Sequence, residues 1–213
     1  MRMDRRSLLL AGLALATAGL PVSIRPALAA SASQLAAAEV PVQKLNAALL
    51  DVMQNAASLR FEGRYQKLQP VLAAVFDVPE MTRIAVGPTW TKLDDADRSA
   101  MTDVFARYMT TIYAARFNGY GGETFDVVEA KPRDDGAVLV ITKLNRKDKE
   151  PVELSYLLRG EADQWHVVDV YYNGAISQLA QLRSEFIAPL RDGGIANLRS
   201  VLESKIKELQ GGA

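Results

Sequence analysis

The chain has 213 residues, a formal net charge of zero, no cysteine and a single histidine. The missing cysteines exclude disulfides and thiolate metal sites, and a balanced charge without a basic stripe argues against nucleic-acid binding. This length, with 49% hydrophobic residues, suits one domain with a sizeable core.

The first segment has the pattern of a secretory signal peptide. Arg2, Arg5 and Arg6 form a positive end, residues 7–20 are almost wholly apolar or small, and residues 27–29 (Ala-Leu-Ala) provide a cleavage site. The apolar run is shorter than the roughly 20 residues that a membrane-spanning helix needs. These features predict export, with an attached N-terminal anchor helix as the alternative.

Cleavage after Ala29 leaves residues 30–213, which we expect to form a single domain. This part has 21 basic and 24 acidic side chains, a net charge of −3. The pair Arg5-Arg6, followed by Ser7, also fits a twin-arginine export signal. We therefore expect the protein in the periplasm or outside the cell.

Apolar residues recur at helical spacing in six segments of the remaining chain. These segments are residues 40–57, 65–76, 79–86, 94–118, 177–190 and 195–209. Pro41 suits the first turn of the first helix. Gly193-Gly194 separates the last two helices.

Four strands are predicted between the fourth and fifth helices. They cover residues 123–130, 136–144, 152–159 and 164–172. Short, turn-like linkers join them, which indicates an antiparallel meander. We therefore predict an α+β fold, with a four-stranded antiparallel meander sheet packed by helices.

The chain offers few candidates for catalysis or metal binding. His166 has no nearby cluster of metal ligands in the sequence, and an ordinary strand histidine is the simplest interpretation. Residues 119–122 (Gly-Tyr-Gly-Gly) follow a predicted helix and lack the lysine of a phosphate-binding loop, so we interpret them as a helix end. The sequence indicates no cofactor and no metal site.

Asp169 is more informative, because it lies within an apolar strand where a solvated charge is unexpected. A buried carboxylate must be paired or protonated. An ion pair with Arg64 or Arg159, or hydrogen bonds from backbone amides, would explain it structurally. A role as an acid or base at the mouth of a sheet-lined cone is the functional alternative.

A basic cluster precedes the second predicted helix and extends into it. Arg60, Arg64 and Lys67 surround Phe61 and Tyr65. Arg64 and Lys67 could meet an anionic head group or an acidic partner. A solvated helix face is the alternative interpretation.

The remaining feature is an excess of apolar residues on the predicted helices and strands. A helix carrying tyrosine and methionine should pack on the sheet, and such side chains line adaptable apolar sites. We predict that an apolar ligand contacts Leu72, Phe76, Met81, Phe105, Tyr108, Met109, Ile112, Tyr113, Val138, Val140, Leu154, Tyr156, Val168 and Val170. The apolar pattern alone does not separate a cavity from a filled core.

Six segments, in their order and spacing, carry a family resemblance. They are residues 60–65 (RFEGRY), 76–81 (FDVPEM), 86–90 (VGPTW), 113–120 (YAARFNGY), 165–170 (WHVVDV) and 184–186 (SEF). Together with the signal peptide, they resemble the MlaC or toluene-tolerance family of periplasmic lipid carriers, including its hopanoid-associated branch. The resemblance covers nearly all of residues 30–213.

The resemblance implies an NTF2-like cone with an apolar cavity for phospholipid or hopanoid-like lipid. It implies shuttling between an outer-membrane lipoprotein complex and an inner-membrane ABC transporter complex, without catalysis. One alternative is an NTF2-like enzyme acting on a small apolar substrate, with Asp169 or His166 as acid or base. The other is an adaptor that only bridges membrane complexes.

Overall fold

The computed structural model describes residues 31–212, so the predicted signal peptide lies outside the described residues. In chain order the elements are α1 (Ala32–Gln54), α2 (Ala56–Val75), α3 (Val78–Val86), the 3₁₀ helix η1 (Gly87–Lys92), α4 (Asp95–Arg116), β1 (Thr124–Pro132), β2 (Val138–Arg146), β3 (Lys149–Glu161), β4 (Gln164–Tyr172), β5 (Ile176–Ser177) and α5 (Gln178–Gly211). The α+β class expected from the sequence is confirmed. Within this part of the chain, no helix is long and apolar enough to cross a membrane.

The sheet is an antiparallel meander with the order β1-β2-β3-β4-β5. It has five strands, and the prediction of four was wrong. The missed strand, β5, has only two residues, and Ile176 and Ser177 pair with Tyr172 and Tyr171. Two residues are too few to show the apolar–polar alternation by which a strand is recognised in a sequence.

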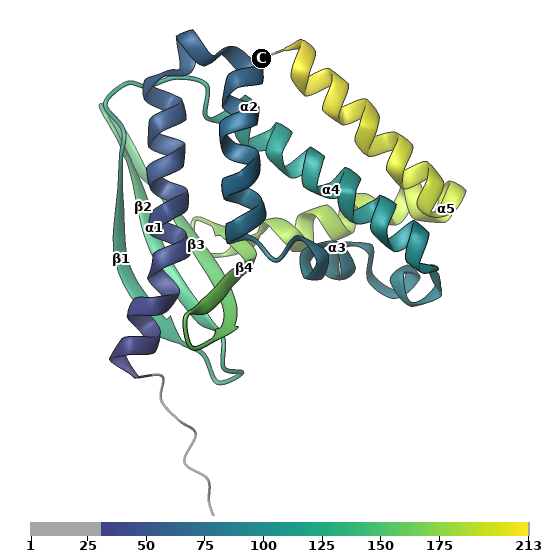
Figure 1. Cartoon of the computed structure of the whole chain (residues 1–213), viewed down its shortest axis with the longest axis horizontal. Helices are drawn as coiled ribbons and strands as arrows, with labels where there is room; N and C mark the ends of the chain where they lie inside the picture. Colours follow the sequence, from purple (N-terminus) through teal and green to yellow (C-terminus); the bar gives the residue numbers. More distant parts are fainter. Residues whose placement is uncertain (1–30, 213) are drawn as a thin grey trace, which may run out of the picture.

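Helix α1 lies across one face of the sheet and contacts β1 to β4 (Figure 1). This inner sheet face is apolar: Tyr156 of β3 lies between Val140 of β2 and Val170 of β4. Leu45 and Leu49 of α1 are fully buried in the same core. Burial of these side chains supplies the main favourable free energy of the fold.

The remaining helices extend the molecule away from the sheet. Helix α2 packs beside α1, α4 packs between α2 and α5, and α3 contacts α4 and α5 (Figure 1). Phe105 of α4 and Phe186 of α5 meet edge to face, with ring centroids 6.3 Å apart. The helices α2, α3, α4 and α5 thus form a second apolar layer beside the α1–sheet layer.

Helix α1 begins eight residues earlier than expected. Ser31 Oγ accepts a hydrogen bond from the amide of Gln34, and Gln34 Oε1 accepts one from the amide of Ser31. This capping box starts the helix at Ala32 and places Pro41 inside it. The prediction began the helix at residue 40, with Pro41 in its first turn, and overlooked the Ser-x-x-Gln cap.

Two helices are interrupted. Arg60 breaks α2 near its start, with φ 52° and ψ −168°. Gly193 and Gly194 break α5 into two halves, which confirms the separation predicted there. Gly194 has φ 65°, a backbone conformation that glycine adopts without steric cost.

Candidate functional site

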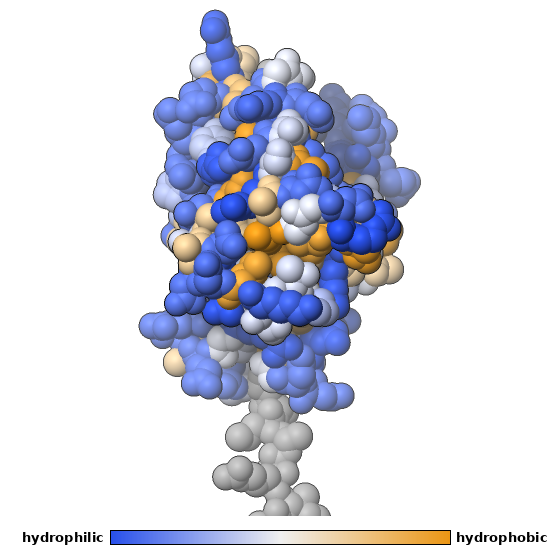
Figure 2. All heavy atoms as spheres, turned by 90° about the vertical axis from the view of Figure 1, so that its right-hand side faces the viewer, coloured by the Kyte–Doolittle hydropathy of each residue, from blue (hydrophilic) through white to orange (hydrophobic). Residues whose placement is uncertain are grey.

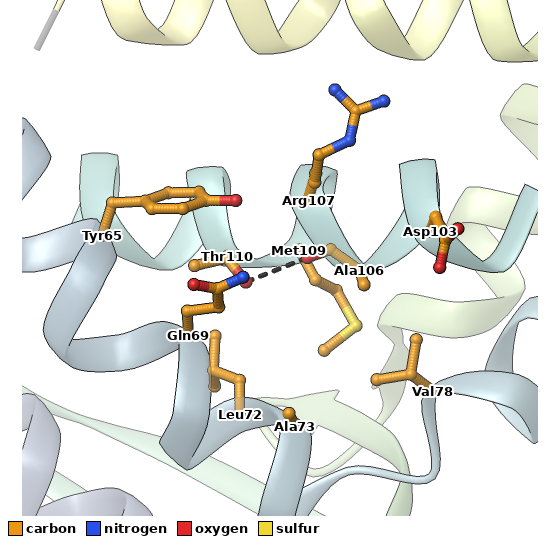
Figure 3. Close-up of a pocket in the computed structure, with 10 residues that line it drawn as sticks. All are labelled: Tyr65, Gln69, Leu72, Ala73, Val78, Asp103, Ala106, Arg107, Met109 and Thr110. Atoms are coloured by element: carbon orange, nitrogen blue, oxygen red, sulfur yellow. Dashed lines mark hydrogen bonds between the residues drawn. The ribbon is translucent and has the colours of Figure 1, made fainter. Parts of the chain in front are cut away.

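A pocket of about 230 Å³ lies between α2 and α4, with α3 at one end (Figure 3). Its lining residues come from these three helices. They are Tyr65, Gln69, Leu72, Ala73, Val78, Asp103, Ala106, Arg107, Met109 and Thr110. On α2, residues 65, 69, 72 and 73 follow one another at intervals of four, three and one, and the lining residues of α4 have a similar helical spacing. Each of the two helices therefore presents one stripe of side chains to the pocket.

The pocket is apolar inside and polar at its rim. The side chains of Leu72, Val78 and Met109 are buried, and in Figure 3 Met109 points towards the other two. Asp103 and Arg107 are exposed and place the mouth of the pocket at the surface. A pocket of this kind suits a ligand with an apolar tail and a polar end.

Arg107 places a positive charge at the mouth. Its guanidinium points away from the apolar interior towards α5 (Figure 3), where Nη2 donates to Glu203 Oε1 at 3.1 Å. On the α2 side, burial raises the pKa of the Tyr65 phenol, and the positive charge of Arg107 opposes that shift. Arg107 therefore influences both the pocket and the α4–α5 contact.

A second, more open groove of about 450 Å³ adjoins the pocket between α4 and the second half of α5. It shares Asp103 and Arg107 with the pocket and is otherwise bordered by Ala100, Val104, Ala196, Arg199, Ser200 and Glu203. Arg199 Nη1 lies 3.4 Å from Asp97 Oδ1, which forms a further link from α5 to α4. The groove is bordered by both polar and apolar side chains and meets the mouth of the pocket at Asp103 and Arg107.

Two of the fourteen residues expected to contact an apolar ligand, Leu72 and Met109, line this pocket. Eight others are buried in the protein interior: Phe76, Met81, Phe105, Tyr108, Val138, Val140, Tyr156 and Val168. The last four are partly buried and pack against the core: Ile112, Tyr113, Leu154 and Val170. All of the residues that line the pocket come from helices.

The prediction from the sequence omitted eight of the ten residues that line the pocket, among them the polar Tyr65, Gln69, Asp103 and Arg107. Apolar periodicity selects core positions, whereas these polar side chains belong to stripes at the boundary of the core. The sequence did contain one signal for them. Two helical faces combine polar and apolar side chains: one consists of residues 65, 69 and 72, and the other of residues 103, 106, 107 and 110.

The Asp169 carboxylate is held by hydrogen bonds within the fold. Its Oδ1 accepts hydrogen bonds from the amides of Val170 (2.7 Å) and Leu179 (3.1 Å), and its Oδ2 accepts one from Ser177 Oγ (2.6 Å). Backbone amides and a hydroxyl therefore compensate the buried charge, in place of an arginine. This carboxylate anchors the N-terminus of α5 to β4 and does not face the pocket described above.

Arg64, Lys67 and His166 do not line the pocket, and each has its own surroundings. Arg64 is buried, and its Nε donates to Ala114 O at 2.9 Å near the C-terminal end of α4. Lys67 Nζ pairs with Asp51 Oδ2 of α1 at 2.6 Å. His166 is partly exposed on β4, opposite Arg159 of β3. Within residues 31–212, no group of three or more histidine and acidic residues is arranged to hold a metal ion.

The family model of the MlaC protein matches residues 43–204, which is most of the chain. The chain belongs to the MlaC family. No curated protein sequence gives a significant match.

A solved structure has the same fold as this MlaC-family protein. It is a phospholipid-binding protein from Ralstonia solanacearum, determined in complex with a phospholipid. The two chains share 20% sequence identity, and the match covers 84% of this chain and 99% of the other, with a TM-score of 0.69. At this level of identity the likeness concerns the fold.

Proposed function

We propose that this protein is a periplasmic lipid carrier that takes up phospholipid in the pocket between α2 and α4. Membership of the MlaC family and the phospholipid-binding relative of the same fold support lipid binding. The observation that carries the proposal is the pocket itself, with Leu72 and Met109 inside and Arg107 at the mouth. An apolar interior followed by a cation at the mouth matches a phospholipid, in which an acyl chain is followed by a phosphate.

The size of the pocket indicates how loading takes place. Sites for drug-sized ligands have volumes of about 300–1,000 Å³, and a two-chain lipid needs more still. The pocket of about 230 Å³ must therefore widen. We propose that α2 and α4 separate and that the opened cavity extends towards Tyr156 and the inner sheet face, as in the expected NTF2-like cone.

Physical chemistry explains why such a carrier is required. Burying one CH₂ group is worth about 0.8 kcal/mol, so exposing two acyl chains to water costs on the order of 20 kcal/mol. A lipid therefore does not cross an aqueous compartment at a useful rate by itself. Release from the carrier requires a partner that opens or competes for the pocket, because affinity alone would retain the lipid.

We further propose shuttling between an outer-membrane lipoprotein complex and an inner-membrane ABC transporter complex. Figure 2 shows hydrophobic residues gathered in the middle of one face, within a surround of hydrophilic residues. Helix α5 contributes exposed apolar surface, since Ile187 is 61% exposed. Apolar patches with a polar rim are typical of protein or membrane interaction sites. Phospholipid is the proposed cargo, with a hopanoid-like lipid as the other candidate.

Extraction of the purified, exported protein with organic solvent, followed by mass spectrometry, tests the carrier proposal. We expect about one lipid per chain, and the mass of that lipid distinguishes phospholipid from hopanoid. The protein should also move a fluorescent phospholipid between two populations of vesicles. Absence of bound lipid, together with absence of uptake from vesicles, would refute the proposal.

A further inference from the structure

The mouth of the pocket holds two opposite charges that do not neutralise each other. Asp103 and Arg107 lie four residues apart on α4, a spacing at which aspartate and arginine commonly pair. Arg107 instead donates to Glu203 of α5 at 3.1 Å. Among residues 31–212, Asp103 has no cation within ion-pair distance. A cation and a carboxylate therefore stand about one helical turn apart beside an apolar pocket.

Arg107 keeps the capacity to bind a phosphate. A guanidinium has five N–H donors, and the contact with Glu203 uses one nitrogen, Nη2. The two side chains of that ion pair are 49% and 52% exposed. Ion pairs this exposed contribute about 0–1 kcal/mol, so a phosphate can share or displace the carboxylate. The Tyr65 hydroxyl and the Gln69 amide, which also line the pocket, provide further donors.

The charge balance at the mouth disfavours a purely anionic head group. The positive charge of Arg107 is balanced against two negative charges in the pocket and the adjoining groove, the carboxylates of Asp103 and Glu203. The other cation that borders the groove, Arg199, pairs with Asp97 at 3.4 Å. A ligand that brings only negative charge would meet Asp103 without compensation.

We infer that this rim selects a phospholipid whose head group carries both a phosphate and a primary ammonium, as in the ethanolamine phospholipids. The phosphate lies at Arg107, and the ammonium, two carbon atoms further, donates hydrogen bonds to the Asp103 carboxylate. A choline head group has no N–H to donate, and a glycerol head group has no positive charge. This inference rests on the proposed carrier function and adds the determinant of its cargo.

The test is a competition between two lipids with identical acyl chains. The protein is incubated with vesicles that contain equal amounts of phosphatidylethanolamine and phosphatidylglycerol, and native mass spectrometry measures the bound ratio. Wild-type protein should take the ethanolamine lipid in about two- to fivefold excess, the effect of one exposed charge contact. Asp103→Asn should bring the ratio close to one, and Asp103→Lys should invert it.

Asp134→Asn is the matched control, because Asp134 is an exposed carboxylate in the β1–β2 turn, away from the pocket. It should keep the wild-type ratio. Arg107→Gln should lower uptake of both lipids, since both carry the phosphate. Uptake without preference by the wild type, or a ratio unchanged by both Asp103 variants, would overturn this inference alone. Failure of the wild type to bind either lipid would overturn the carrier proposal as well.

Discussion

Asp169 Oδ1 of β4 accepts a hydrogen bond from the backbone amide of Leu179, the second residue of α5, at 3.1 Å. Through this contact a strand carboxylate holds the positive end of a helix dipole. Ser177 Oγ, which caps α5 by accepting from Ala180, also donates to Asp169 Oδ2. One buried side chain thus joins the sheet to the helix that packs against α4.

Asp169→Ala should destabilise the protein by about 2–3 kcal/mol, because hydrogen bonds to a charged group are lost and the amides of Val170 and Leu179 lose their acceptor. Urea unfolding monitored by circular dichroism measures this change. Asp134→Ala, at an exposed turn position, is the control. In the folded variant, lipid uptake should persist. Loss of uptake without loss of stability would instead favour a direct role of Asp169 at a ligand.

Ala73→Phe should block the pocket and abolish most lipid uptake. Ala73 lines the pocket but is itself exposed, so a phenyl ring can be added without disrupting the core. Ala74→Phe is the matched control, because Ala74 is the next residue on the same helix, is also exposed and does not line the pocket. Uptake from vesicles and thermal unfolding are measured for both variants. Equal uptake by the two would place the lipid elsewhere.

Arg60→Gly should raise stability by about 1 kcal/mol. At φ 52° and ψ −168°, Arg60 occupies a region of backbone conformations that is almost restricted to glycine, and the strain costs about 1–3 kcal/mol. Glycine relieves this strain, although its greater freedom in the unfolded chain offsets part of the gain. Arg60→Ala retains the strained backbone and should not stabilise. The midpoint of urea unfolding distinguishes the two variants.

Two tyrosines should make the fold sensitive to alkaline pH: Tyr156, which is buried, and Tyr113, which is partly buried against the core. Burial raises the pKa of Tyr113 and Tyr156 in the folded state. Their contribution to stability is therefore complete below the unfolded pKa of about 10 and is lost as the pH rises towards the folded pKa. Above pH 10, each should lower the free energy of unfolding by up to about 1.4 kcal/mol per pH unit.

Urea unfolding at pH 8, 10 and 11 measures this dependence. Tyr156→Phe should reduce the loss of stability between pH 10 and 11 by about 1 kcal/mol. Tyr120→Phe, which removes a hydroxyl from an exposed ring, is the control. The structure indicates that the Tyr156 phenol is shielded from water. If Tyr156→Phe left the pH dependence of the unfolding free energy unchanged, that shielding would be contradicted.

Local patterns in the chain were sufficient for the α+β class, the antiparallel meander and the break in α5. Each depends on signals within a few residues: apolar spacing, short turn-like linkers and the pair Gly193-Gly194. The same signals failed at β5, which has two residues, and at the start of α1, where the Ser31–Gln34 cap was overlooked in favour of Pro41.

The pocket depended on packing between elements distant in the chain. Tyr65 and Arg107 are 42 positions apart in the sequence, and only the contact of α2 with α4 places them at one mouth. Periodicity identified buried residues such as Phe105 and Tyr156, but hydrophobic burial has no direction, so a filled core and a cavity wall give the same pattern.

The environment of Asp169 was decided in the same way. The chain alone showed that a carboxylate in an apolar strand needs compensation. Whether an arginine or backbone amides would provide it depended on where the N-terminus of α5 lies in space. The residue pattern states which groups must find partners, and tertiary packing selects the partners because it alone brings remote groups within hydrogen-bonding distance.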